Sequence, residues 1–127
     1  MSARQKKRRW AEISQGADVL FHDADAAGLG VFQAASERHV YAFGSNRNQN
    51  DVAPAVVLAS AVTSIPQAFL KIASAVKAGD FHPRMIELMV RVLLNPRLVS
   101  RIPAPVMTQV EAAEKGIASG KIVVPSQ

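Results

Sequence analysis

The sequence predicts an α/β domain built on a parallel β-sheet. Three short apolar runs are separated by polar loops, and amphipathic helical patterns follow the first and the third run. The chain has 127 residues, of which 49% are hydrophobic and 20% charged, as is typical of one globular domain. Strands that alternate with helices form parallel sheets with right-handed crossovers. We therefore expect three β-α steps of one parallel sheet over residues 17–78.

The first predicted strand covers residues 17–21, and a polar loop separates it from a helix predicted over residues 28–39. Leu29, Phe32 and Ala35 recur on one face of this helix. We expect that face to be buried.

The second and third strands are predicted over residues 40–43 and 55–62, and the third (AVVLASAV) is apolar enough to be buried on both faces. Ser64 and Gln67 have the spacing of a capping box at the start of the next helix, and Gly79 supplies its stop. The apolar stripe of this helix consists of Ile65, Phe69, Ile72 and Val76. We expect the stripe to pack against the sheet.

The remaining segments are less regular. Residues 84–94 are mostly apolar, and Glu87 and Arg91 lie four residues apart, which suits a helix as well as a strand pair. Another amphipathic helix is predicted between Pro105 and Gly120, followed by a last strand over residues 122–124. The stripe of that helix comprises Val106, Val110, Ala113 and Ile117.

Positive charge is concentrated at the start of the chain. Residues 4–9 hold five of the 15 basic residues, and ten acidic residues balance the other basic ones. A nucleic-acid binder would carry basic residues across its folded face as well, so we expect no nucleic-acid partner. We divide the chain into a basic tail with a partial helix (1–16), a partial ligand-binding lobe (17–79), and crossover strands with a helix and a C-terminal strand (80–127).

Several classes of protein are disfavoured by what the sequence lacks. It contains no cysteine, which excludes disulfides and thiolate metal sites. No apolar run approaches the roughly 20 residues of a membrane-spanning helix. Residues 1–15 lack the apolar stretch of a secretory signal. No sequence motif of a hydrolase or a metalloprotease is present.

Three loops are expected to meet at the carboxyl edge of the sheet, where α/β proteins bind ligands. In the first loop, His22, Asp23 and Asp25 precede Gly28 at a helix start. Two carboxylates would repel a phosphate there, and Gln33 interrupts a dinucleotide-binding glycine pattern. Two alternatives to a ligand contact stay open: the three side chains could hold a metal, or one aspartate could cap the helix.

After Gly44, the second loop presents Asn46, Asn48 and Asn50 in alternation with other polar residues, and Thr63 follows the third strand at the same edge. Amides both donate and accept hydrogen bonds, which suits neutral polyols and heterocycles. Asparagine also tolerates positive φ, so a purely conformational role is an equal alternative.

Five segments resemble the basic membrane protein family of bacterial lipoproteins, which includes purine-nucleoside receptors of ABC transporters. In chain order they are GADVLF from Gly16, GLGVFQAA from Gly28, VYAFG from Val40, DVAPAVVLAS from Asp51 and GIASGKIVVP from Gly116. The resemblance implies a type I periplasmic-binding fold, in which two α/β lobes enclose a ligand. It also implies a nucleoside-like small-molecule ligand, an ABC permease partner for the full-length protein, and a location in the periplasm or at the outer face of the plasma membrane.

The chain departs from the family pattern at three places. The family's second loop commonly reads Gly-x-Asp-x-Asp, and its first carboxylate is similar in position to one that holds ribose hydroxyls; Asn46 and Asn48 stand at these positions here. Thr63 replaces a frequent lysine. The resemblance also begins inside the family's second lobe. We therefore expect an incomplete lobe from the C-terminal part of a receptor, and self-association of this fragment.

The sequence thus predicts a substrate-binding fragment of an uptake system for a nucleoside or similar compound. We predict no catalytic residue, no metal and no cofactor. The predicted ligand-binding residues are His22, Asp23, Asp25, Gly28, Gly44, Asn46, Asn48 and Thr63. A small cytoplasmic α/β enzyme or cofactor-binding module is the alternative, and a basic-tailed interaction protein is a third hypothesis.

Overall fold

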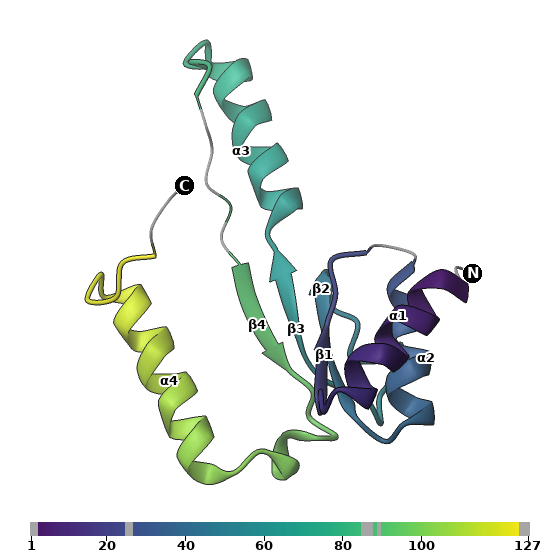
Figure 1. Cartoon of the computed structure of the whole chain (residues 1–127). Coiled ribbons are helices and arrows are strands. Elements are labelled where there is room, and N and C mark those ends of the chain that lie inside the picture. The colour runs from purple at the N-terminus through teal and green to yellow at the C-terminus, as the bar shows by residue number, and fades with distance from the viewer. Residues whose placement is uncertain (1–2, 25–26, 85–87, 89, 125–127) are drawn as a thin grey trace.

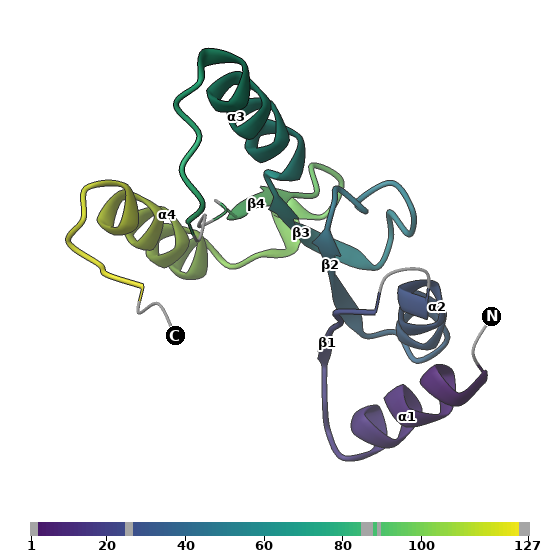
Figure 2. The same cartoon turned by 90° about the horizontal axis from the view of Figure 1, so that it is seen from above.

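A computed structural model describes residues 3–24, 27–84, 88 and 90–124 of the chain (Figure 1). In chain order the elements are α1 (Ala3–Ser14), β1 (Val19–Phe21), α2 (Gly28–Glu37), β2 (Tyr41–Asn46), β3 (Val57–Thr63), α3 (Ile65–Ala78), β4 (Val90–Leu94), the 3-10 helix η2 (Val99–Arg101) and α4 (Ala104–Ala118). The sheet lies at the centre, and the α1–α2 pair, α3 and α4 leave it in three different directions (Figure 2).

The four strands form one sheet in the order β1-β2-β3-β4. The first three are parallel, which confirms the predicted parallel sheet. β4 is antiparallel to β3, with Leu94 opposite Ala59 and Val90 opposite Thr63. The segment whose periodicity suited either a helix or a strand pair is therefore extended at its C-terminal end, where it pairs with the edge of the sheet.

The step from β2 to β3 differs from the prediction. β2 continues to Asn46, three residues beyond the predicted end, because Gly44, Ser45 and Asn46 pair with β3. The connection over residues 47–56 then returns to the start of β3 through turns, without a helix. Two of the three parallel strands are thus followed by a helix, and the expectation of three β-α steps is wrong at β2.

The core lies on one face of the sheet, beneath α2. It is formed by Leu20, Val31, Phe32, Ala35, Ala42, Val56 and Val57. Leu29 was expected on the buried face, but its side chain is 43% exposed, whereas Val31 is fully buried. The face that points to the sheet is centred on Val31, Phe32 and Ala35, and Leu29 projects to its side.

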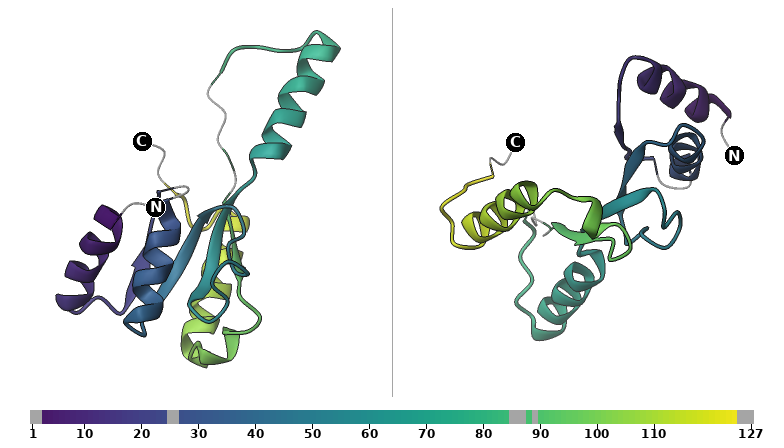
Figure 3. Two further views of the ribbon diagram at one scale, coloured as in Figure 1. Left: turned by 90° about the vertical axis from the view of Figure 1, so that its right-hand side faces the viewer. Right: turned by 90° about the horizontal axis from the view of Figure 1, so that it is seen from below.

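α1 forms an outer layer on α2, so that the layers run α1, α2, sheet (Figure 3). The basic residues of the N-terminal run lie within this helix. Ile13 packs against the core, and the Arg38 guanidinium lies 5.2 Å from the centre of the Trp10 ring. This cation–π contact joins the end of α2 to α1.

α3 does not pack on the sheet as expected. It has no buried residue, and Phe69 in its apolar stripe is 69% exposed. The helix continues beyond the end of β3, so no sheet lies beneath it (Figure 1). Ser64 precedes the helix without a side-chain capping bond, so the predicted capping box is absent, whereas Gly79 ends the helix with a left-handed φ of 71° as predicted.

The last described residues fold back onto α4. The Ile122 N–H donates to the Gly116 carbonyl over 3.0 Å, and a Cβ on Gly116 would lie 2.7 Å from Ile122 Cδ1. The predicted strand over residues 122–124 is therefore wrong, because this segment turns back to the helix instead of reaching the sheet. The helix itself and the positive φ of 73° at Gly120 agree with the prediction.

No helix within the described part of the chain is long and apolar enough to cross a membrane.

Gly28→Ala should destabilise the fold. A Cβ at this position would lie 2.2 Å from His22 Cε1, and the ring is held against Phe32. Such overpacking typically costs about 1–3 kcal/mol. Urea denaturation of Gly28→Ala, His22→Ala and the double variant measures the coupling, and the double variant should lose less stability than the sum of the single ones. Ser36→Ala on the exposed side of α2 is the control. Additive losses would contradict the ring contact as the cause.

Candidate functional site

Polar side chains meet at the carboxyl edge of the parallel strands. The Asn46 amide at the end of β2 donates from Nδ2 to Asp23 Oδ1 in the loop after β1, over 3.3 Å. Both side chains are exposed, and Thr63 ends the neighbouring strand β3 at the same edge. Three segments that are far apart in the sequence therefore present Asp23, Asn46 and Thr63 together, which we call the polar edge.

The backbone of Asn46 fits the conformational role that was weighed for the asparagines of this loop, and its contact with a ligand stays a prediction. Its φ is 66°, in the left-handed region that asparagine tolerates better than most residues. The turn that follows is closed by a 2.7 Å hydrogen bond from the Arg47 N–H to the Ser45 carbonyl. The same backbone conformation that ends β2 leaves the Asn46 side chain at the polar edge.

Asn48 is exposed, but the oxygen of its side-chain amide takes part in the turn formed by residues 48–50. Oδ1 accepts a hydrogen bond from the Asn50 N–H over 3.0 Å. An Asx turn of this kind shapes the loop locally. Any contact of Asn48 with a ligand would therefore involve mainly its Nδ2 donors.

Two neighbouring amides point inward instead. Gln49 accepts a hydrogen bond from the Ser45 N–H at Oε1 over 2.8 Å, and its own N–H donates to Ser60 Oγ over 3.0 Å. The Ser60 hydroxyl donates in turn to Asn50 Oδ1 over 2.8 Å. All four side chains are buried. The side chains of Gln49, Asn50 and Ser60, together with the Ser45 N–H, form what we call the buried amide network, which fixes the β2–β3 connection on the sheet.

The buried amide network also reaches β4. Asn50 Nδ2 donates to the carbonyls of Leu93 and Leu94 over 3.1 and 3.2 Å. Beyond the strand, Asn95 Nδ2 donates to the carbonyls of Pro54 and Val57 over 3.0 and 2.7 Å. Two buried asparagines thus satisfy backbone carbonyls where the antiparallel strand joins the parallel sheet.

Gly44 is required by the close approach of this connection. A Cβ there would lie 2.6 Å from Ser60 Oγ and 2.9 Å from Gln49 Cβ. Gly44 is also buried. Gly44 would therefore affect a ligand site only indirectly, because it allows the loop to lie close to the sheet.

His22 and Gly28 lie below the polar edge. The His22 side chain is 2% exposed, and its ring meets the Phe32 ring edge to face at 5.1 Å. Gly28 packs directly on the same ring. Asp25 lies outside the described residues. Among the residues described, which do not include Asp25, no three His, Asp or Glu side chains lie close enough together to hold a metal ion.

Sequence reasoning treated the whole loop after Gly44 as facing a ligand and missed the inward turn of Gln49 and Asn50. One signal was present in the sequence. The third strand begins soon after this loop, and no helical pattern covers the backbone between them. A connection without its own helix needs side-chain partners for its backbone groups, and buried Gln, Asn and Ser supply them.

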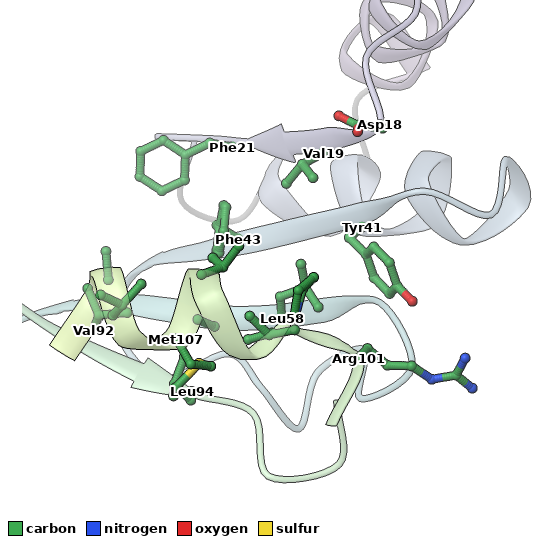
Figure 4. Close-up of a pocket in the computed structure, with 16 residues that line it drawn as sticks. Asp18, Val19, Phe21, Tyr41, Phe43, Leu58, Val92, Leu94, Arg101 and Met107 are labelled. Carbon is green, nitrogen blue, oxygen red and sulfur yellow. The ribbon is translucent and has the colours of Figure 1, made fainter. Parts of the chain in front are cut away.

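A feature separate from the polar edge lies on the sheet face opposite α2. It is an apolar groove of about 740 Å³ between the sheet and α4. Phe21 and Phe43 line one end, with ring centres 6.4 Å apart, and Tyr41 and Arg101 lie at the other (Figure 4). From α4, Val106, Met107 and Val110 complete the wall. Its aliphatic and aromatic lining contrasts with the amides and carboxylate of the polar edge.

Asn50→Ala should reduce stability far more than Asn48→Ala. The first substitution leaves Ser60 and two β4 carbonyls without their buried partner, whereas the second removes one exposed turn bond. Buried unsatisfied groups cost about 1–3 kcal/mol each, so we expect a loss of at least about 2 kcal/mol for Asn50→Ala and less than about 1 kcal/mol for Asn48→Ala. Chemical denaturation of the matched pair measures both. Equal losses would show that the amide network is not a main support of the connection.

Several solved structures, among them two that cover most of this chain, share this fold. One is described as a transcriptional activator of the comK gene from Bacillus halodurans; it has a TM-score of 0.70 and 15% identity, over 87% of this chain and 40% of that chain. The other is an ABC transporter system solute-binding protein from Conexibacter woesei, with a TM-score of 0.63 and 20% identity, over 95% of this chain and 41% of that chain. The chain spans about two fifths of the length of these structures. No curated protein matches it.

The likeness to the solute-binding protein agrees with the predicted incomplete α/β lobe of a periplasmic-binding fold. The family described as "ABC transporter substrate-binding protein PnrA-like" (Bmp) matches residues 4–83, well over half of the chain. These residues include α1 to α3, and with them the polar edge and the buried amide network. The chain therefore belongs to the Bmp family of PnrA-like ABC transporter substrate-binding proteins.

Proposed function

We propose that this chain provides one side of the ligand-binding cleft in a nucleoside or similar uptake system. The ligand would be a polar heterocycle or polyol held at the polar edge. The observation that carries the proposal is the hydrogen bond between Asn46 and Asp23, which joins two predicted ligand-binding residues from different strands at the carboxyl edge. Family membership supports the coarser role of substrate binding for transport.

The chemistry of the polar edge favours ligands rich in hydrogen-bond donors. The Asp23 carboxylate accepts only, and it retains acceptor capacity after the single bond from Asn46. Hydroxyl groups of a sugar or the N–H groups of a heterocycle would satisfy it, and a bond to a charged acceptor is stronger than one to a neutral amide. A phosphate would be repelled by the same carboxylate. The edge therefore suits an uncharged nucleoside better than a nucleotide.

The predicted site residues would contribute in two ways. Asp23, Asn46, Thr63 and the Nδ2 group of Asn48 would touch the ligand. His22, Gly28 and Gly44 are buried, and they would act by holding the loops in position. Asp25 would belong to the same loop as Asp23.

The setting proposed for the whole protein follows from its family. As a substrate-binding component it would work in the periplasm or at the outer face of the plasma membrane and deliver its ligand to an ABC permease. It would act by binding and release, without catalysis. Self-association of the isolated chain belongs to the same proposal, because large apolar side chains of α3 and of the sheet are exposed.

The chain should bind nucleosides only weakly by itself. Cleft sites bury about 70–90% of a ligand's surface, and one polar edge provides only part of that enclosure. Losing half of a binding free energy of about −8 to −10 kcal/mol moves a micromolar site to the millimolar range.

Titration of the isotope-labelled chain with adenosine, guanosine and inosine, followed by NMR, tests the site. We expect dissociation constants in the millimolar range, about 1 mM or weaker. The shifts should be concentrated at Asp23, Asn46 and Thr63. Asn46→Ala and Asp23→Ala should each abolish these shifts, while Gln109→Ala, which removes an exposed amide from α4, should leave them unchanged.

Two results would contradict the proposal. Micromolar binding by the monomeric chain would show that the site is complete without a facing lobe. Shifts that persist in Asn46→Ala would show that the ligand binds elsewhere.

A further inference from the structure

The excess positive charge of the chain is concentrated on one helix. Five of its 15 basic residues lie in residues 4–9, within α1, and the ten acidic residues of the chain balance the other ten basic ones. The formal net charge of +5 therefore corresponds to the basic residues of α1. A local excess of positive charge on an outer element attracts polyanionic partners.

Contacts in the second half of α1 show which side of the helix points inward. Ile13 packs against the core, and the Trp10 ring lies 5.2 Å from the Arg38 guanidinium at the end of α2. Ala11, on the other side of the helix from Ile13, is exposed. The outward side of α1 is therefore the side of Ala11.

Three basic residues share this outward side. Positions 4, 7 and 8 precede Ala11 by seven, four and three residues, and residues at these spacings lie on one side of an α-helix. Arg4, Lys7 and Arg8 thus occupy the same side of α1 as the exposed Ala11. We call these three positions the basic face.

The other two basic residues of α1 are not part of the basic face. The Arg9 guanidinium donates to both carboxylate oxygens of Glu12, over 2.8 and 2.6 Å, so this pair is neutral. Position 6 precedes Trp10 by four residues and Ile13 by seven, which places Lys6 on the inward side of the helix. Glu12 is the only acidic residue in the sequence of α1. The charge of the basic face is therefore not compensated within the helix.

The basic face differs from the apolar surfaces that an absent lobe would cover. A protein interface that buried three unpaired positive charges would be strongly unfavourable. α1 lies on the far side of α2 from the sheet, and away from α3 and α4 (Figures 2 and 3). A partner for this face must bring negative charge of its own.

Nucleic acids and anionic membranes both carry such charge, and the distribution of charge in the chain favours the membrane. Nucleic-acid binders usually spread positive charge over the folded face, whereas the rest of this chain is formally neutral. A bilayer surface with anionic headgroups attracts a local cluster of Lys and Arg without further contacts. We propose that α1 binds the surface of a bilayer that contains anionic lipids, through Arg4, Lys7 and Arg8.

This contact leaves the polar edge accessible. α2 separates α1 from the sheet, so a bilayer against the outer side of α1 does not cover the carboxyl ends of the strands (Figure 3). The proposal does not depend on the identity of the ligand. It goes beyond the transport role because it assigns one side of the molecule to the membrane.

Flotation of the full 127-residue chain with lipid vesicles in a sucrose gradient tests the proposal, and it separates bound protein from aggregates, which sediment. We expect flotation with phosphatidylcholine vesicles that contain about 30% phosphatidylglycerol, and none with phosphatidylcholine alone. Raising the salt concentration from about 0.05 M to about 0.5 M should release the protein. A variant that combines Arg4→Gln, Lys7→Gln and Arg8→Gln should bind at least about 50-fold more weakly, because each basic residue near an anionic surface strengthens binding about fivefold.

A matched variant removes the same charge elsewhere. Lys71→Gln, Lys77→Gln and Lys115→Gln together neutralise three exposed lysines of α3 and α4. Binding to the anionic vesicles should be unchanged in this variant. Far-UV circular dichroism checks that both triple variants keep their helices.

Four results would overturn the proposal. Equal losses in the two triple variants would show that net charge is responsible, and not the basic face. Equal flotation with both kinds of vesicle would show apolar adsorption, and no flotation with either would exclude a membrane surface. Binding to duplex DNA that is tighter than to the anionic vesicles at equal phosphate concentration, and that the α1 variant loses, would assign the basic face to a nucleic acid.

Discussion

The Ser60 hydroxyl joins three parts of this structure at one buried point. It accepts from the Gln49 backbone N–H and donates to the side-chain Oδ1 of Asn50, whose Nδ2 in turn donates to two backbone carbonyls of β4. Parallel strands need a connection that returns along the sheet, and that connection is usually a helix with its own backbone bonds. Here the ten residues 47–56 contain no helix, so buried side chains supply the missing partners. The end of β2, and with it Asn46, has a defined position because this connection is fixed.

The two faces of the sheet differ in how far they are covered. On one face α2 and the β2–β3 connection cover Leu20, Ala42 and Ser60 completely or nearly so. That face acts as the rigid support of the polar edge. On the other face Phe21 and Phe43 remain exposed beside α4, and the surface there is apolar. The polar edge and the apolar groove therefore lie on different parts of the same sheet.

The strands and helices could be predicted wherever the local sequence pattern determines them. Apolar runs gave the three parallel strands, and Gly79 and Gly120 marked the ends of α3 and α4. The predictions were wrong where contacts with residues distant in the sequence determine the structure. An amphipathic stripe indicates that a helix should pack but not against what, so α3 was assigned to a sheet that it does not cover. Likewise, Ile122, Val123 and Val124 have high strand propensity, but the segment turns back to α4, where the Ile122 N–H donates to the Gly116 carbonyl.

The polar edge was predictable in its position but not in the role of each residue. Strand direction alone brings the loops after β1, β2 and β3 to one edge. Whether an amide near the end of a strand is exposed or faces the core depends on the path of the backbone. For that reason Asn46 and Asn50 differ, although they are only four residues apart. At Asn46 the family resemblance points to a carboxylate, and a second carboxylate beside Asp23 would repel it. Asparagine instead donates to Asp23 while it keeps the left-handed φ of the turn. The carboxylate at this edge is thus supplied by Asp23, in the loop after β1.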